Sequence, residues 1–388
     1  MRARNLVAGA VAATLFTGPA AWAGTGERGN GLQRDADAIR DLGVVGVQVR
    51  EFPRTGPGKA ITSGVADIRT GRPVPPDGYS RIGSVTKAFT ATVVLQLVGE
   101  DRLAVDDTVE RWLPGVVRGN GNDGRRMTVR NLLQHTSGLH DDIPPLSRSA
   151  EDFHRHRYDT HPPEEMVTRA LRHRPDFEPG KGWKYGNTGY ILLGMIIERV
   201  TGDSWYSQMQ KRILRPLGLR HTTWPGASPT VPGPHAEGYQ RFTPGTLVNV
   251  TEHRQAYTAG AAGGLISTTA DVGAFFRALL GGRLLRPALL ARMKRTVPVK
   301  GDLLRFWPGA RNGLGLFSRP LSCGGRFWSH GGDILGYKDR NAFTSDGRYG
   351  VVLSMSTQLA ESPDSRLEQE HAATQLIDNA LCRAKRTT

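Results

Sequence analysis

The chain has 388 residues, of which 38% are hydrophobic and 22% charged, a composition typical of a folded globular protein rather than a disordered or fibrous one. Its formal net charge is +15, but the basic residues are scattered, and no zinc-finger or RNA-recognition pattern accompanies them. We therefore expect no nucleic-acid partner, and the length suffices for one large domain or two closely packed ones.

The chain begins with a pattern typical of a secretory signal peptide. The basic segment MRARN precedes the apolar run LVAGAVAATLF, and the small residues of AWA predict cleavage after Ala23, giving a signal peptide over 1–23. No later stretch reaches the roughly eighteen apolar residues that a membrane-spanning helix needs. We expect a secreted, extracellular protein with no transmembrane helix after cleavage. Anionic cell-wall polymers are candidate partners for its charge, although an arginine-rich coding bias would give the same composition.

Strand and helix patterns lie at both ends of the mature chain. The first part predicts a polar helix and two strands, at residues 24–42, 44–50 and 60–68. The last part predicts a strand pair and an amphipathic helix, at residues 338–357 and 364–382. One antiparallel sheet built from both termini accounts for this order of elements.

The segment between these ends is mostly helical in pattern. Four stretches have the period or length of helices, namely 128–139, 162–173, 188–202 and 204–218. A short strand at 262–268 leads into a helix at 269–281. We predict an α/β (α+β) fold, with an antiparallel sheet flanked by helices and an inserted, mainly helical domain. The predicted sheet domain comprises 24–99 and 246–388, and the insertion 100–245.

The chain has two cysteines, Cys323 and Cys382. In an exported protein such a pair favours a disulfide, which would tie the C-terminal segment to the rest of the domain. The alternative is two buried free thiols.

Ser84 stands three residues before Lys87, at the start of a nearly continuous apolar stretch. A simple interpretation makes Ser84 an N-cap, but a capping box would place Glu or Gln at position 87. A lysine there opposes the positive end of the helix dipole, and burial of its ammonium is costly unless its pKa falls. A catalytic interpretation fits better, because a neutral lysine on the same helix face can take the proton of the Ser84 hydroxyl.

Ser-x-x-Lys alone is a weak motif, but two later motifs support it. WKYGNTG holds Tyr185 and Asn187, and WSHGGDILGY holds His330, Gly331 and Gly332. The ordered set S-x-x-K, Y-x-N and H-x-G resembles that of the penicillin-recognising serine hydrolases, of the serine D-alanyl-D-alanine carboxypeptidase and class C β-lactamase type. Further segments, including TVRNLLQHTSGL and GGLISTTAD, are similar in the same order, so the resemblance covers most of the chain and implies the same fold.

The resemblance implies a role for each matching residue. Ser84 matches the acylated nucleophile and Lys87 its partner. Tyr185 would be a general acid or base if a charged Lys87 lowers the pKa of its phenol. Asn187 would hold Lys87 and the substrate amide, and His330 stands where β-lactamases usually have lysine.

The glycines after this histidine have an implied role in substrate binding. Gly331 and Gly332 would let the substrate lie against the strand backbone, and the N–H of Asp333 would join that of Ser84 in an oxyanion hole. The alternative for the Tyr185 motif is an ordinary helix-entry turn. We expect no cofactor and no metal site, because the histidine-rich segment 153–161 lacks the spacing of a zinc motif.

Three departures from the family pattern bear on the substrate. The H-G-G motif lacks the hydroxyl that usually follows the first residue. Asp333 places a carboxylate near where a substrate carboxylate would bind, and Phe317 stands where related carboxypeptidases offer an arginine, although Arg319 is close enough to substitute.

We predict a secreted serine D-alanyl-D-alanine carboxypeptidase-like hydrolase that forms an acyl-enzyme on Ser84 and acts on cell-wall peptides. The first alternative keeps the machinery and changes the substrate, giving an esterase, a D-aminopeptidase or a class C β-lactamase-like hydrolase acting on small peptides, esters or β-lactams. A second alternative is a non-catalytic penicillin-sensing or wall-binding module, against which the intact motif residues count.

Overall fold

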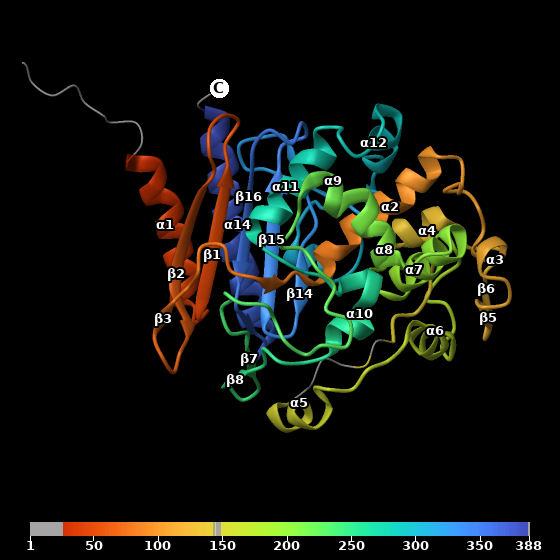
Figure 1. Ribbon diagram of the computed structural model, residues 1–388, viewed down its shortest axis with the longest axis horizontal. Helices are drawn as coiled ribbons and strands as arrows, with labels where there is room; N and C mark the ends of the chain where they lie inside the picture. Colours follow the sequence, from red (N-terminus) through yellow and green to blue (C-terminus); the bar gives the residue numbers. More distant parts are fainter. Residues whose placement is uncertain (1–25, 143, 145–148, 387–388) are drawn as a thin grey trace, which may run out of the picture.

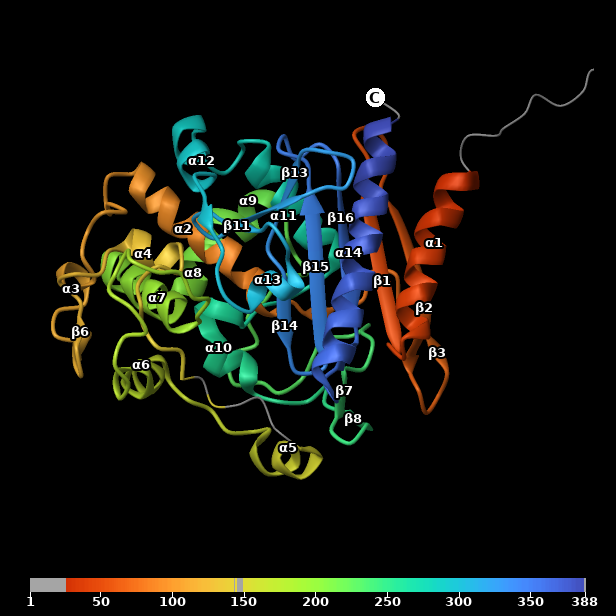
Figure 2. The same ribbon diagram turned by 180° about the vertical axis from the view of Figure 1, so that it is seen from behind.

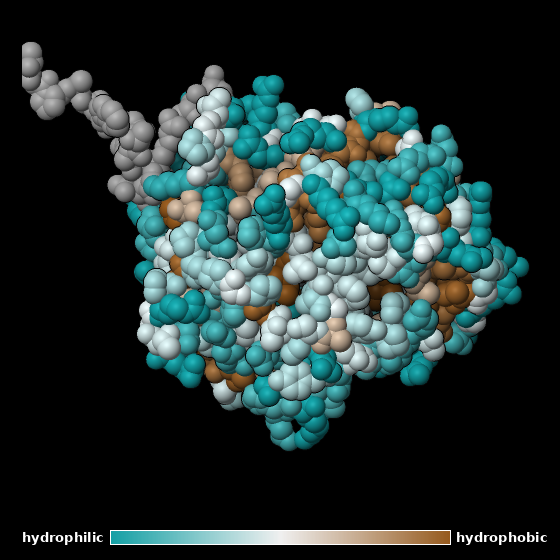
Figure 3. Space-filling view, viewed as in Figure 1, coloured by the Kyte–Doolittle hydropathy of each residue, from teal (hydrophilic) through white to brown (hydrophobic). Residues whose placement is uncertain are grey.

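The computed structural model describes residues 26–142, 144 and 149–386 (Figure 1). The predicted signal peptide lies outside the described residues. Within them, no helix combines the length and the apolar character needed to cross a membrane. The face seen in Figure 3 is mostly hydrophilic, and apolar side chains show mainly in its recesses.

A large antiparallel sheet is built from both ends of the chain. The strands, in spatial order, are β10 (Val297–Pro298), β11 (Arg311–Asn312), β12 (Phe317–Pro320), β13 (Arg326–Ser329), β15 (Tyr337–Phe343), β16 (Gly350–Met355), β1 (Gly46–Phe52), β2 (Lys59–Asp67) and β3 (Arg72–Pro73). The short strand β14 (Gly332–Ile334) pairs with β15 beside this path. N-terminal β1 pairs with C-terminal β16, with Val47 opposite Met355, so the two chain ends share the middle of the sheet.

Helices cover both faces of this sheet (Figure 2). Helices α1 (Gly26–Asp41) and α14 (Pro363–Arg386) pack together on one face, and α11 (Thr269–Leu280) packs on the other. Alternate residues of a strand point to opposite faces, so Val351 and Leu353 join the core under α1 and α14 while Val352 joins the core on the α11 side. The predicted fold class is therefore confirmed.

Several of the remaining helices pack against α2 (Thr86–Gly99), which is buried along most of its length. The remaining helices are α3 (Val109–Trp112), α4 (Val129–Leu133), α5 (Ala150–His156), α6 (Pro163–Leu171), α7 (Thr188–Thr201), α8 (Trp205–Met209), η2 (Gln210–Leu214), α9 (Arg215–Leu217), α10 (Gln255–Gly263), α12 (Pro287–Met293) and α13 (Leu303–Phe306). Small sheets are formed by β17 (Thr357–Leu359) with β7 (Tyr239–Phe242) and β8 (Thr246–Asn249), by β4 (Ser80–Arg81) with β9 (Ile266–Ser267), and by β5 (Arg118–Gly119) with β6 (Asn122–Asp123).

Two predicted elements are shorter than expected. The helix predicted over 128–139 ends at Leu133, because His135 has a left-handed backbone with φ of 58°. The strand predicted over 262–268 is reduced to Ile266–Ser267, because the Ala- and Gly-rich residues before it complete α10.

The predicted disulfide between Cys323 and Cys382 is confirmed, with a Cα–Cα distance of 5.8 Å. Cys323 lies in the turn between β12 and β13, and Cys382 lies on α14. The bond therefore fixes α14 to the turn that joins β12 and β13.

Candidate active site

Ser84 and Lys87 lie where the chain passes from β4 into α2. Gly83–Val85 form a single 3-10 turn (η1), and Lys87 is in the first turn of α2 with 0% of its surface exposed. The N-cap interpretation of Ser84 is wrong, because no side-chain cap hydrogen bond is made at either helix start. The Ser84 hydroxyl is instead within hydrogen-bond distance of Lys87 Nζ, at 3.0 Å.

The Lys87 amine is held by three oxygen atoms. Besides Ser84 Oγ, it contacts Asn187 Oδ1 at 2.7 Å and the carbonyl of Ala262 at 2.7 Å. Burial lowers its pKa to about 7, and the more distant Asp141 charge only partly opposes this. A neutral Lys87 amine has two N–H groups, which donate to Asn187 Oδ1 and to the Ala262 carbonyl. Its lone pair is then free to accept the proton of the Ser84 hydroxyl.

Asp141 fixes the orientation of Asn187. One carboxylate oxygen accepts hydrogen bonds from the Asn187 and Thr188 N–H groups at 2.8 and 2.9 Å, and the other accepts one from Asn187 Nδ2 at 2.9 Å. These bonds satisfy N–H groups at the start of α7 and turn Asn187 Oδ1 toward Lys87. The same turn therefore both starts α7 and holds Asn187 Oδ1 against Lys87.

Tyr185 lies over this amine from the same turn. Lys87 Nζ is 5.0 Å from the centre of its ring, and His135 packs on the ring at a centroid distance of 4.5 Å. Loss of water around the phenol raises the pKa of Tyr185 above its usual value, and its hydrogen bond with Ser84 only partly opposes this. The phenol is therefore protonated at neutral pH, which corrects the expectation that Lys87 lowers its pKa.

The strand β14 passes directly over the turn that carries Ser84. Gly83 has φ of +49°, and a Cβ on it would lie 2.8 Å from the Asp333 carbonyl oxygen. A Cβ on Gly332 would lie 1.9 Å from the Ile82 carbonyl oxygen and 3.0 Å from the Ser84 nitrogen.

The strands β14 and β15 form a hairpin with a two-residue loop, which the pair Ile334 and Tyr337 closes. Because hydrogen-bonded and non-hydrogen-bonded pairs alternate along such a hairpin, the next pair, Asp333 and Lys338, is not hydrogen-bonded. The N–H group of Asp333 therefore points away from β15, and β14 packs closely on the turn that carries Ser84.

His330 is buried at the other side of Tyr185, with a centroid distance of 6.4 Å between the two rings. Its Nδ1 lies 2.7 Å from the Gly331 carbonyl, and its Nε2 has no hydrogen-bond partner among the described residues. Burial, assisted by Lys87, lowers the pKa of His330 to about 3, so the ring is neutral. Phe317 packs edge-on against it at 5.2 Å.

Asp333, whose side chain is half exposed, joins an ion-pair network of otherwise buried side chains behind β14. Its carboxylate is 2.9 Å from Arg340 Nη1, and the other face of Arg340 binds Glu370 of α14. Lys338 Nζ is 3.1 Å from Glu370. Arg319 points into this network, 4.0 Å from Glu370 and stacked on Trp307, rather than toward Ser84. Arg319 therefore does not supply the cation that is missing at Phe317.

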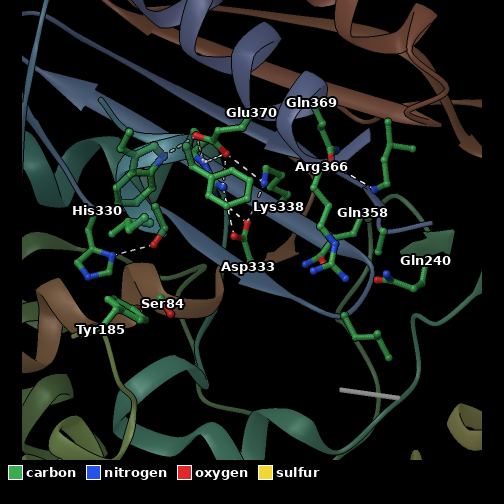
Figure 4. A pocket seen from close by; sticks show the side chains of 18 of the residues that line it. Ser84, Tyr185, Gln240, His330, Asp333, Lys338, Gln358, Arg366, Gln369 and Glu370 are labelled. Carbon is green, nitrogen blue, oxygen red and sulfur yellow. Dashed lines mark hydrogen bonds and ion pairs between the residues drawn. The ribbon is translucent and has the colours of Figure 1, made fainter. Parts of the chain in front are cut away.

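Two cavities meet at Ser84. The larger, of about 660 Å³, is also lined by Tyr185, His330 and Asp333 and extends to α14 (Figure 4). The second, of about 480 Å³, runs from Ser84 past Asn187 toward α5 and α10. A carbonyl group placed at Ser84 would thus have room for substituents on both of its sides.

The family model for beta-lactamases matches residues 33–375 of this chain. The chain belongs to the beta-lactamase family. Among solved structures, a D-stereospecific amidohydrolase from Streptomyces sp. is 38% identical, with a TM-score of 0.79, over 88% of this chain and 98% of that one. A D-amino acid amidase from Ochrobactrum anthropi SV3 is 27% identical, with a TM-score of 0.80, over 92% of this chain and 99% of the other.

Curated relatives match a smaller part of this beta-lactamase-family chain. Penicillin-binding protein 4 of Amycolatopsis lactamdurans is 33% identical over 162 residues, which is 42% of this chain and 40% of the relative. Esterase EstB of Burkholderia gladioli is 34% identical over 175 residues, 43% of each chain. The matched region is therefore less than half the length of either relative.

The structure brings the predicted site residues together. Ser84, Tyr185, Asn187, His330, Gly331 and Asp333 line the larger cavity, Lys87 lies beneath Ser84, and Gly332 packs against the turn. The sequence analysis missed Asp141, Arg340 and Glu370. Asp141 had no clear signal, because Asn187 is a preferred N-cap residue and the start of α7 therefore looks capped in the sequence. The partners of Asp333 had no local signal.

Proposed function

We propose that the protein is an exported serine hydrolase that cleaves amide or ester derivatives of D-amino acids through an acyl-enzyme on Ser84. The observation that carries the acyl-enzyme step is the contact between Ser84 Oγ and a buried Lys87 whose pKa is lowered to about 7. A base of this pKa is half deprotonated near neutral pH, where a general base works best.

Each step of the reaction has a group in place. Neutral Lys87 takes the Ser84 proton as Oγ attacks the substrate carbonyl, and the N–H groups of Ser84 and Asp333 stabilise the oxyanion. The protonated Tyr185 phenol gives its proton to the departing amine or alcohol and regains one from Lys87. Water then attacks the ester carbonyl while Lys87 accepts its proton, and return of that proton to Oγ releases the acid product.

The charges around Ser84 support an ammonium-bearing substrate. Half of the Asp333 side chain is exposed, in both cavities that meet at Ser84. Burial tends to raise the pKa of Asp333, but Arg340 and Lys338 outweigh this and hold it below the usual value, so the group is a carboxylate. Phe317 is an uncharged ring where a terminal carboxylate would need a cation. An α-ammonium beside the scissile carbonyl suits this site better than a carboxylate does.

The comparisons support the same substrate class. The two solved structures named for D-stereospecific hydrolysis of amides align over nearly their whole lengths. The penicillin-binding relative supports a second candidate, a D-alanyl-D-alanine carboxypeptidase that acts on cell-wall peptides.

Labelling and hydrolysis together test the proposal. Purified mature protein and its Ser84→Ala variant are incubated with a fluorophosphonate and with fluorescent penicillin, and then assayed on D- and L-phenylalanine amide and on an acylated D-Ala-D-Ala peptide. We expect Ser84-dependent labelling and faster hydrolysis of the D-amide. D-Alanine release without amide hydrolysis would favour the second candidate. No labelling and no hydrolysis of any substrate would overturn the acyl-enzyme proposal.

Export has its own test. Expression with and without residues 1–23 should place the full-length product outside the cell and retain the truncated one inside. Retention of both forms would contradict export.

A further inference from the structure

The larger cavity extends well beyond the reacting groups. Figure 4 shows Ser84, Tyr185 and His330 at one end and Arg366 with Gln240 at the other. Gln240 comes from β7 and Arg366 from the first turn of α14. A substrate that extends from Ser84 along the whole of this cavity of about 660 Å³ would meet both side chains.

Arg366 carries a charge that the protein itself does not use. The other charged side chains of this cavity are paired with one another, as Asp333 with Arg340 and Lys338 with Glu370. Arg366 is exposed and has no ion pair or side-chain hydrogen bond with the described residues. Its position near the positive end of the α14 dipole gives the helix no stability either. The cavity lining, with three cations and two carboxylates, therefore has one excess positive charge at this end.

Gln240 is a second unused polar group. It is 4% exposed, it lines the cavity, and its amide oxygen has no hydrogen-bond partner among the described residues. The neighbouring Gln358 and Gln369 differ, since their amides donate to the Ile334 and Thr357 carbonyls at 2.7 Å. A buried amide is rarely left without a partner, and a substrate N–H would supply one here.

We propose that Arg366 and Gln240 form a subsite for a carboxylate on the distal part of an extended peptide substrate. Arg366 binds the carboxylate, and Gln240 accepts a hydrogen bond from a substrate peptide N–H. The carboxylate is either the peptide C-terminus or an acidic side chain. The subsite deepens the proposed function and rests on it.

Matched peptides and variants test the subsite. The peptides share a D-phenylalanyl group at the scissile bond, and their distal ends carry a free carboxylate, a carboxamide, or a carboxamide with an aspartyl side chain. They are assayed with wild type, Arg366→Gln, Arg366→Lys and Arg305→Gln. Arg305 is an exposed residue of nearby α13 outside the cavity lining, so its variant controls for the loss of one positive charge.

We expect wild type to favour one of the two carboxylate-bearing peptides over the plain carboxamide peptide. The preference should be about fivefold in kcat/KM and should arise mainly from a lower KM. Arg366→Gln should bring that ratio near one, Arg366→Lys should keep part of it, and Arg305→Gln should leave it unchanged. The same peptides are titrated calorimetrically onto Ser84→Ala protein with and without Arg366→Gln. Carboxylate-selective binding that depends on Arg366, without hydrolysis by wild type, would refute only the proposed function. Equal ratios with and without Arg366 in both assays would overturn the subsite.

Discussion

Lys87 and Arg340 are both buried cations near Ser84, but their surroundings differ. Arg340 lies between the carboxylates of Asp333 and Glu370, whereas the hydrogen-bond partners of Lys87 among the described residues are the neutral oxygens of Ser84, Asn187 and Ala262. A buried cation with carboxylate partners stays charged, and one without them holds its proton weakly. Arg340 is therefore a structural charge, whereas Lys87 is a reactive group that can lose its proton near neutral pH.

Removal of the reactive amine should have the largest effect. Lys87→Met keeps a side chain of similar length, and we expect kcat/KM on amide and ester substrates to fall at least about a thousandfold. The free energy of unfolding, measured in urea at neutral pH, should not fall, since desolvation of an ammonium no longer opposes folding. Activity within about tenfold of wild type would show that another group takes the Ser84 proton.

Breaking the paired network should cost stability. Glu370→Gln leaves Arg340 and Lys338 buried with one carboxylate fewer, and we expect the free energy of unfolding to fall by about 3 kcal/mol or more. Glu368→Gln, at an exposed position of the same helix, is the control and should change it by less than about 0.5 kcal/mol. Similar losses in both variants would mean that the network is not structural.

The proton on Lys87 should set the pH dependence of activity. Because burial lowers its pKa to about 7, kcat/KM for a substrate without titratable groups should rise with pH and level off above an apparent pKa near 7. Stability should also rise with pH between about 7 and 10, since the unfolded chain binds the lysine proton more tightly there. Lys87→Met should reduce the slope of stability against pH, and a flat kcat/KM profile in wild type would refute the assignment.

A smaller shift should follow from Asp141→Asn. The Asp141 charge favours protonated Lys87, so its loss should move the apparent pKa of kcat/KM to lower pH. Asp142→Asn is the adjacent control, because Asp142 pairs with Arg169 instead. A shift in the same direction and of the same size in both variants would mean that general surface charge, not Asp141, acts on the lysine.

Much of this site could be predicted from the sequence because its motifs resemble those of a known family, and each motif is a short local segment. Ser84 and Lys87 are one helical turn apart, Tyr185 and Asn187 share one helix-entry turn, and the glycines beside His330 mark a close backbone approach. The missed partners are distant in the chain. Glu370 reaches Arg340 only because α14 packs across β15, and nothing near either residue indicates this contact.

The sequence by itself determined the order of the reactive motifs, predicted the sheet from both termini and favoured the disulfide, since each depends on local periodicity or residue type. Only the tertiary structure decided which charges are compensated. It placed Arg319 against Glu370 rather than beside Phe317, raised the pKa of Tyr185 by burial, and left Arg366 in the cavity without an ion pair among the described residues. The physical reason is that burial and charge pairing depend on distances between segments far apart in the chain, which no local pattern encodes.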